Sequence, residues 1–352
     1  MRKGIMGGRQ FWSGAVWSLL MVVGSLCAED QQEGGPKFEP LYNGTDLSGW
    51  VAKDGKIESW KADGELLSCV TGGGGWLRTE KMYSDYVLKL EFKIPKGGNS
   101  GVGLRFPAEG NPAHVGMEVQ ILDDEAEEYK GLKDAQYTGG VYYQAAAKRG
   151  HLKPVGEWNS YEITCKGPQV KVVLNGEVIN DIQVDKYTKA ESPENEKYTP
   201  LAERPETGYI GLQCHDTQVD FRNIAIQDLT KPLVVEIEDG DGAKQVEMRY
   251  IDLVEGEGDQ PNPESIVTVH YTGRFLDGTT FDSSRKRGRA LTLPLKSFIK
   301  GWQAGISEMK VGGRRKLVIP PDLAYGKRGY PGGVIPPDAT LIFDVELLGT
   351  NH

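Results

Sequence analysis

The sequence has few cysteines, and none of them are paired at the spacing of a metal site. The four cysteines of the 352-residue chain, Cys27, Cys69, Cys165 and Cys214, lie far apart along it. Structural zinc sites use cysteines separated by about two to four residues, so this class of metal centre is excluded. Removal of a leader containing Cys27 would leave three cysteines. They allow either one disulfide with a free thiol or three buried thiols.

The chain also has fewer positively than negatively charged side chains. The chain has 41 Lys and Arg against 50 Asp and Glu, which gives a formal net charge of -9. This charge repels a phosphate backbone, so nucleic acid is not an expected partner. Two local basic clusters, at residues 285–289 and 314–316, lie in or beside turn-rich stretches. We interpret both clusters as solvated loop charge.

Long apolar runs are missing beyond the N-terminus, where no stretch is apolar enough to span a bilayer. At the N-terminus, three basic residues precede an apolar run from Phe11 to Leu26. This order is typical of an export signal, and the run is shorter than the roughly 20 residues of a membrane-spanning helix. We therefore expect a signal peptide at residues 1–28 and a periplasmic or extracellular protein. A lipid anchor on Cys27 is disfavoured by the bulky residue before it.

The pattern after the leader divides the chain into two domains. Residues 29–37 are polar and Gly-rich, as in a flexible stalk. Residues 38–229 show successive strand patterns, and residues 245–352 show strands with one helix. Between them, residues 230–244 change from apolar to acidic and Gly-rich, and we interpret them as a linker. Each domain is long enough to bury its own core.

The first domain is predicted to be all β. Apolar residues alternate with polar ones at 86–94, 161–165 and 170–174. This period of two places one face of each strand in a core. Asn175-Gly176 follows the last of these strands and predicts a two-residue hairpin turn, because both residues tolerate positive φ. Many antiparallel strands without intervening helices predict a β sandwich or jelly roll.

The second domain is predicted to be α+β, with a curved antiparallel sheet around one short helix. Apolar residues at 267, 269 and 271 and at 341, 343, 345 and 347 share strand faces. The helix is predicted by Phe298, Ile299, Trp302, Ile306 and Met309 at three- and four-residue spacing. Ser297 is the candidate N-cap, and Gly312-Gly313 follows the helix.

Five motifs in this second domain resemble a known family. They are VHYTG from Val269, FDSS from Phe281, FIKGW from Phe298, AYG from Ala324 and IPPDATLIFDVELL from Ile335. In this order and spacing they resemble the FKBP-type peptidyl-prolyl cis-trans isomerases, across essentially all of residues 245–349. The resemblance implies an enzyme that needs no cofactor, acts on proline-containing polypeptides and binds macrolide inhibitors.

The resemblance also implies an apolar pocket. Its catalytic residues would be Tyr271, Phe281, Asp282, Trp302, Tyr325 and Phe343. Its substrate-binding residues would be Phe298, Ile299, Ile335, Leu291 and Tyr330. Leu291 stands where the family commonly has phenylalanine, and Tyr330 where it often has histidine, so we expect altered substrate preference and macrolide affinity. Rotation about a prolyl bond breaks no bond, so the absence of a nucleophile is no objection.

The first domain resembles a second family. Its motifs are LYNGTDLSGW from Leu41, GGNSGVGLRF from Gly97, MEVQILDD from Met117, TGGVYY from Thr138, GEWNSYEI from Gly156 and LQCHDTQVDFRNI from Leu212. They are similar to the 3-keto-disaccharide hydrolase domain family, whose fold is a lectin-like (concanavalin-like) β sandwich. The resemblance implies a saccharide ligand and cleavage of 3-keto-glycosides. The alternative is a non-catalytic carbohydrate-binding module that localises the isomerase.

Strand parity selects candidate residues in this domain. In MEVQIL, Glu118 and Gln120 share one face, and in GVGLRF, Arg105 points away from its apolar neighbours. We expect these three residues to line a polar concave face, joined by residues close to the motif cores, Asp123, Tyr142 and His215. A 3-keto group acidifies the neighbouring hydrogen, so Glu118 or His215 could act as base, with Arg105 or a divalent metal stabilising the enolate. The alternative is a wet outer sheet face.

Overall fold

The structure is a computed structural model, and it describes residues 37–70, 75–193, 198–239 and 242–351. The predicted signal peptide and most of the predicted stalk lie outside these residues. Residues 36–352 belong to one compact unit. Among the described residues, no helix has the length and apolarity that a membrane crossing requires.

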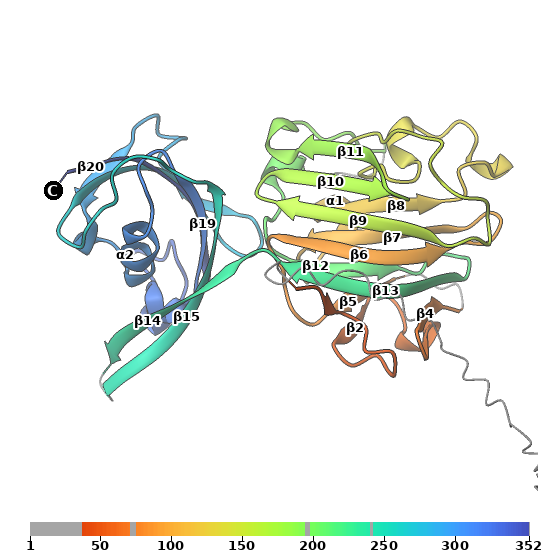
Figure 1. Cartoon of the computed structure of the whole chain (residues 1–352), viewed down its shortest axis with the longest axis horizontal. Coiled ribbons are helices and arrows are strands. Elements are labelled where there is room, and N and C mark those ends of the chain that lie inside the picture. Colours follow the sequence, from red (N-terminus) through yellow and green to blue (C-terminus); the bar gives the residue numbers. More distant parts are fainter. Residues whose placement is uncertain (1–36, 71–74, 194–197, 240–241, 352) are drawn as a thin grey trace, which may run out of the picture. The chain divides into compact units, whose positions relative to one another are not determined.

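Two antiparallel sheets form the predicted sandwich (Figure 1). The first has the order β11-β10-β9-β6-β13-β4-β3, with β1 also paired to β13. Its strands are β1 (Glu39–Pro40), β3 (Trp60–Asp63), β4 (Leu66–Cys69), β6 (Tyr86–Lys93), β9 (Asn159–Lys166), β10 (Gln169–Leu174), β11 (Glu177–Gln183) and β13 (Val219–Asp228). The second has the order β2-β5-β12-β7-β8, with β2 (Trp50–Lys53), β5 (Trp76–Thr79), β7 (Asn99–Phe106), β8 (Met117–Leu122) and β12 (Tyr209–Gln213).

Alternating apolar side chains bury the space between these sheets, as the period of two predicts. In β6 the side chains of Tyr86, Leu88, Leu90 and Phe92 are at most 2% exposed. The predicted Asn175-Gly176 turn joins β10 to β11, with φ of 51° and 90°, which are the positive values that this turn type requires. The short helical segments of the sandwich are α1 (Pro112–Val115), η1 (Ile57–Ser59), η2 (Glu127–Tyr129), η3 (Asp134–Gln136), η4 (Val184–Lys186) and η5 (Leu201–Glu203).

A disulfide joins Cys69, at the end of β4, to Cys214, just after β12, with 5.5 Å between the two Cα atoms. It therefore links the two sheets of the sandwich. The third cysteine after the leader, Cys165, is a buried free thiol. Of the two alternatives that the sequence left open, the structure has one disulfide and a free thiol.

The remaining sheet curves around one helix (Figure 1), as predicted for the second domain. Its order is β14-β15-β19-β20-β16-β17, and β18 also pairs with β16. The strands are β14 (Lys231–Asp239), β15 (Gly242–Val254), β16 (Ile266–Arg274), β17 (Thr280–Ser283), β18 (Leu291–Pro294), β19 (Arg314–Ile319) and β20 (Leu341–Asn351). The helices are α2 (Lys300–Ser307), η6 (Leu295–Ser297), η7 (Pro321–Leu323) and η8 (Gly326–Arg328).

The helix begins later than the sequence predicts. Ser297 ends η6 instead of capping α2, and Ile299 occupies the N-cap position without a side-chain cap. Phe298 and Ile299 have extended backbone angles, with ψ of 167° and 152°. Two apolar residues counted as helical therefore precede the helix.

Two further predictions differ from the structure. Residues 231–239, which we interpreted as linker, form β14 and pair with β15 along their whole length. Their apolar residues alternate, and Leu233, Val235 and Ile237 pack against the core of the second domain. The basic cluster 314–316 is not loop charge, because it lies on β19 with the side chain of Lys316 fully buried. The cluster 285–289 is exposed, as expected.

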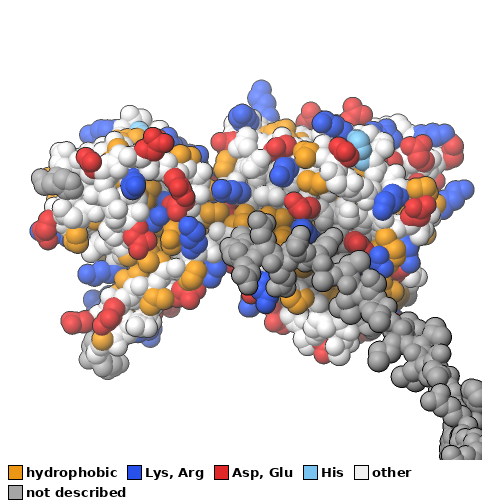
Figure 2. Space-filling model, in the orientation of Figure 1, with side chains coloured by type: hydrophobic (Ala, Val, Ile, Leu, Met, Phe, Trp, Pro, Cys, Tyr) orange, Lys and Arg blue, Asp and Glu red, His pale blue; other side chains and the backbone are white. Residues whose placement is uncertain are grey.

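Charged side chains of both signs are interspersed over the face of the molecule that Figure 2 draws. A continuous basic surface of the kind that attracts a nucleic acid is not visible on that face.

Candidate functional site

One cavity of about 610 Å³ lies in the second domain, where β16, β17, β18, β20 and α2 contribute side chains to it. All eleven residues that the sequence predicts for the isomerase pocket line this cavity. Leu293, Ser297 and Val334 line it as well, and the sequence did not select them. Residues separated by up to 72 positions, from Tyr271 to Phe343, are thus brought to one place.

Aromatic rings form the inner part of the cavity. The indole of Trp302, on α2, is 3% exposed, and its ring centroid lies 5.1 Å from those of Tyr271 and Phe343. Both rings meet the indole edge to face, while Phe298 stacks on it at 4.8 Å. These geometries are favoured by the ring quadrupoles and fix the rings as a rigid wall. The buried Nε1 of Trp302 has no hydrogen-bond partner among the described residues.

The polar edge of the cavity is a three-residue network. Tyr271 donates a hydrogen bond from its hydroxyl to Asp282, and Arg287 forms an ion pair with the same carboxylate. Arg287 also donates from Nη2 to the Tyr271 hydroxyl oxygen at 2.9 Å. The carboxylate is therefore held in place from two sides at the rim. This role of Arg287 was not predicted, because the residue lies five positions after Asp282 in a loop without a recognisable motif.

Tyr325 and Tyr330 line the cavity from the loop that follows β19. Their ring centroids are 5.2 Å apart, and the rings meet edge to face. Burial raises the pKa of the Tyr325 hydroxyl, so this group is a neutral hydrogen-bond donor at physiological pH. Tyr330 is 48% exposed and reaches into solvent.

In the sandwich, β7 and β8 bring Glu118 and Gln120 to one sheet face, as parity predicts. Their register partners on β7 are glycines, Gly103 for Glu118 and Gly101 for Gln120. A Cβ atom at Gly101 would lie 2.2 Å from Glu118 Oε1, so the missing side chain makes room for this carboxyl group. Burial raises the pKa of Glu118 to about 8. When the Gln120 amide is oriented to satisfy its neighbours, its nitrogen donates to Glu118 Oε1 at 3.3 Å.

Arg105 does not join this face, which corrects the prediction. Its φ of 49° lies in the left-handed region, and the register of β7 with β12 shifts beside it. This bulge interrupts the alternation, so Arg105 turns inward to pair with Asp85 at 3.4 Å and to donate to the carbonyl of Gly167 at 2.7 Å. Phe106 takes its place on the outer face, where its ring occupies the space over Gly103.

The other predicted residues of the sandwich are dispersed. The backbone N–H of Tyr142 donates to the carbonyl of Glu118 at 2.9 Å, so this residue lies beside the face. Asp123 accepts from the N–H of Gly97 at 2.8 Å and organises a turn. His215 is 46% exposed and pairs with the neighbouring residue, Asp216, at 2.7 Å.

An aromatic pair beside Glu118 was not predicted from the sequence. Trp76 and Phe106 both lie over Gly103, and their ring centroids are 6.0 Å apart. In the described part of the chain, no group of three or more His, Cys, Asp and Glu side chains is placed to hold a metal ion. The divalent metal that was considered as an alternative to Arg105 has no such group of ligands among these residues.

Comparison with known families agrees with both resemblances. A family described as the 3-keto-alpha-glucoside-1,2-lyase-like domain matches residues 37–227. A family described as FKBP-type peptidyl-prolyl cis-trans isomerase matches residues 257–348. The first match covers more than half of the chain, and its start and end lie within two residues of the boundaries expected from the sequence.

Individual proteins match one domain or the other. FK506-binding protein 1 of Dictyostelium discoideum is 54% identical over 98 residues, which are 27% of this chain and 91% of the relative. Peptidyl-prolyl cis-trans isomerase Mip of Coxiella burnetii is 50% identical over 101 residues, 29% of this chain and 44% of the relative. A crystal structure of a candidate glycosyl hydrolase from Parabacteroides distasonis is 30% identical, with a TM-score of 0.50, and covers 55% of this chain and 100% of that one.

Proposed function

We propose that this chain is an exported prolyl isomerase with a carbohydrate-active sandwich. It belongs to the FKBP-type peptidyl-prolyl cis-trans isomerase family through residues 257–348. Through residues 37–227 it belongs to the 3-keto-alpha-glucoside-1,2-lyase-like domain family. The observation that carries the isomerase assignment is the single cavity lined by all eleven predicted residues. Proline-containing polypeptides are the proposed substrates.

The walls of the cavity suit rotation about a prolyl bond. Resonance holds the planar amide behind a barrier of roughly 18 to 20 kcal/mol, and twisting the amide removes that resonance and lowers its dipole. An apolar cavity that excludes water therefore disfavours the planar amide relative to the twisted one. A ten-thousandfold acceleration needs only about 5.4 kcal/mol. The rings packed around Trp302, together with one or two hydrogen bonds, are sufficient to supply this free energy.

Two groups that line the cavity supply the polar contacts. We assign the Tyr325 hydroxyl to hold a substrate carbonyl, since burial keeps this group neutral and able to donate. We assign Asp282 to polarise or position the twisting amide, because Tyr271 and Arg287 fix its carboxylate at the cavity edge. Tyr330 and Leu291, which depart from the common family residues, would then tune side-chain preference and affinity for FK506-type macrolides.

The test is prolyl exchange in a short peptide, measured by NMR line shape or by a fluorescent reporter with the full chain at micromolar concentration. We expect acceleration by the wild type and slower exchange with Tyr325→Phe or Asp282→Ala. A folded chain that leaves the exchange rate unchanged would overturn the assignment.

For the sandwich we propose cleavage of 3-keto-glycosides by elimination, with Glu118 as the base. Support comes from the family membership and from the buried carboxyl group, whose pKa of about 8 suits proton transfer near neutral pH. Trp76 and Phe106, at most 4% exposed, pack over Gly103, the register partner of Glu118, and contribute apolar surroundings to this carboxyl group. The second candidate is a carbohydrate-binding module without catalysis, because Arg105, the predicted cation, pairs with Asp85 and does not share a face with Glu118.

Incubation with a 3-keto-glucoside separates these candidates. Product released by the wild type but not by Glu118→Gln favours the enzyme, while binding without turnover favours the module. Export is a separate proposal, which rests on the basic and apolar order of residues 1–28. Expression in a Gram-negative host, followed by fractionation and N-terminal sequencing, tests it. A chain retained uncleaved in the cytoplasm would contradict export.

A further inference from the structure

The connection between the sandwich and the isomerase domain is too short to act as a flexible tether. Only Leu229 and Thr230 separate the last strand of the sandwich, β13, from β14. The N–H of Leu229 donates to the carbonyl of Asp85 at 2.9 Å. Arg249, on β15, donates to the carbonyl of Thr230 at 3.0 Å and to its hydroxyl at 2.6 Å. Both connecting residues are therefore held, one by each domain.

A buried lysine of the isomerase domain has its counter-charges in the sandwich. Lys316, on β19, is fully buried, and its Nζ lies 3.0 Å from Asp85 Oδ2 and 3.0 Å from Glu206 Oε2. Lysine is almost never fully buried unless it is paired, because burial of an unpaired charge is costly. Asp85 is also fully buried. The sandwich thus supplies the carboxylates that offset the free-energy cost of burying the charge of Lys316.

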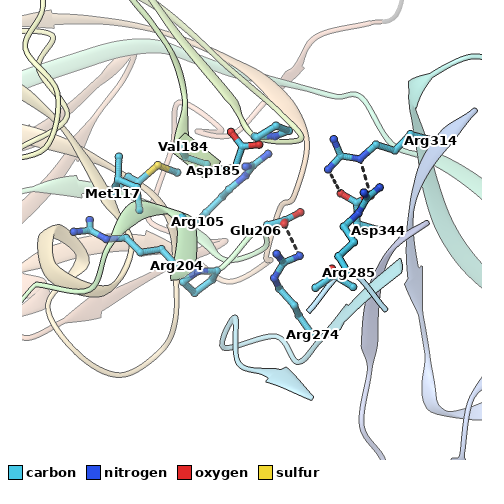
Figure 3. Close-up of a pocket in the computed structure, with 15 residues that line it drawn as sticks. Arg105, Met117, Val184, Asp185, Arg204, Glu206, Arg274, Arg285, Arg314 and Asp344 are labelled. Carbon is cyan, nitrogen blue, oxygen red and sulfur yellow. Dashed lines mark hydrogen bonds and ion pairs between the residues drawn. The ribbon is translucent and has the colours of Figure 1, made fainter. Parts of the chain in front are cut away.

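Two arginines extend these three residues into a cluster. Arg105, which the bulge in β7 turns inward, contacts Asp85, and Arg274, at the end of β16, pairs with Glu206 at 2.7 Å. Figure 3 shows Arg274 and Glu206 facing each other beside a cavity of about 130 Å³. We call Asp85, Arg105, Glu206, Arg274 and Lys316 the junction cluster.

Backbone contacts accompany the junction cluster. A Cβ atom at Gly278, in the turn between β16 and β17, would lie 2.8 Å from the backbone nitrogen of Pro205. A Cβ atom at Gly167, in the sandwich, would lie 2.9 Å from Cδ2 of Leu253 on β15. Neither contact leaves room for another side chain. The domains therefore meet at close-packed surfaces as well as through charges.

These contacts lie next to one wall of the isomerase cavity. The strand β17 has four residues, lies at the end of its sheet and carries Phe281 and Asp282. The turn that leads into it is held by the sandwich at Arg274 and at Gly278. We infer that the sandwich is a positioning element for the isomerase: through the junction cluster it clamps the β16–β17 hairpin and thereby fixes Phe281 and Asp282. This inference rests on the proposed isomerase function.

The experiment uses the full chain with Glu206→Gln, which keeps the side-chain shape but removes the charge that Arg274 and Lys316 share. The matched control is Glu264→Gln, which breaks an exposed pair with Lys296 of 2.6 Å in the same domain. Hydrogen exchange of residues 274–284, followed by mass spectrometry, reports on the hairpin. Peptide prolyl exchange gives kcat and KM.

We expect faster hydrogen exchange of the hairpin in Glu206→Gln and a fall in kcat of roughly three- to tenfold, the size of a coupling effect carried by one packed contact. Glu264→Gln should match the wild type in both measurements. If Glu206→Gln does not fold, Arg274→Met replaces it, and Arg274→Lys, which retains the charge, should restore the rate.

If hydrogen exchange of the hairpin is the same in Glu206→Gln as in the wild type, the inference that the sandwich clamps the hairpin is overturned. Faster exchange with an unaltered kcat would overturn the positioning role. A wild type without isomerase activity would refute the proposed function instead, and hydrogen exchange would still report on the clamp by itself.

Discussion

The carboxylate of Asp282 is held at the cavity rim by a tyrosine hydroxyl and a guanidinium, so its charge and its position can be tested separately. We predict that Asp282→Asn, which keeps the shape but loses the ion pair with Arg287, lowers kcat/KM for prolyl exchange about tenfold or more, since a hydrogen bond to a charged group contributes about 1.5 to 3 kcal/mol. Asp322→Asn, which alters an exposed ion pair with Lys244, serves as the control. Equal rates for the two variants would contradict a role for the Asp282 charge.

The buried carboxyl group of Glu118 predicts a pH dependence for the sandwich. Its pKa of about 8 means that the basic form is scarce at pH 6 and increases as the pH rises. If Glu118 is the base, kcat/KM for a 3-keto-glucoside should rise about tenfold per pH unit below pH 8 and level off above it. Glu118→Gln should abolish turnover, while Glu109→Gln, at an exposed position, should not. A flat profile between pH 6 and 9 would exclude this carboxyl group as the base.

At the residue scale, motifs predicted positions better than parity did. The eleven cavity residues were predicted because their order and spacing follow a family whose cavity uses them together. Arg105 was misplaced because parity assumes unbroken alternation, and one left-handed residue in β7 reverses it. Arg287 was missed because a loop charge in sequence looks the same whether it meets solvent or a carboxylate. Its contact with Asp282 depends on the path of the chain.

At the element scale, the disulfide predicts how the sandwich is stabilised. Cys69 and Cys214 are 145 positions apart, so their bond closes a long loop and restricts the unfolded chain. We predict that reduction, or the double change Cys69→Ala with Cys214→Ala, lowers the free energy of unfolding by about 2 to 5 kcal/mol. Urea unfolding with and without reductant measures the loss. Reductant should have no further effect on the double variant, and an equal response of both proteins would contradict the prediction.

Element types were predictable wherever periodicity was long, and errors arose where burial depends on contacts that the local pattern does not show. The alternation in β6 and β10 predicted strands of the sandwich, and Asn175-Gly176 predicted a hairpin turn. By contrast, residues 231–239 looked like a linker because their polar residues suggested solvent, although their apolar residues alternate as in β14. The basic run on β19 looked solvated because the carboxylates that neutralise Lys316 lie more than one hundred positions earlier.

At the scale of the whole molecule, the junction cluster couples stability to pH through Glu206. Burial alone would raise the pKa of this carboxyl group, but the charges of Lys316 and Arg274 outweigh burial and lower the pKa from 4.5 to about 2. A carboxyl group whose pKa is lower in the folded state stabilises the fold above its unfolded pKa. That contribution is lost as the pH falls towards the folded pKa. The shift corresponds to about 3 kcal/mol at neutral pH.

We therefore predict that Glu206→Gln lowers the free energy of unfolding at pH 7, and that its deficit relative to the wild type shrinks as the pH falls from about 4.5 towards 2. Denaturant unfolding of the full chain at pH 7, 5, 4 and 3 measures this gap, and Glu264→Gln controls for the loss of a carboxylate at an exposed pair. A gap that stays constant with pH would mean that the substitution acts through packing. The charge of Glu206 would then not hold the two domains together, because only a titrating group produces a gap that closes in acid.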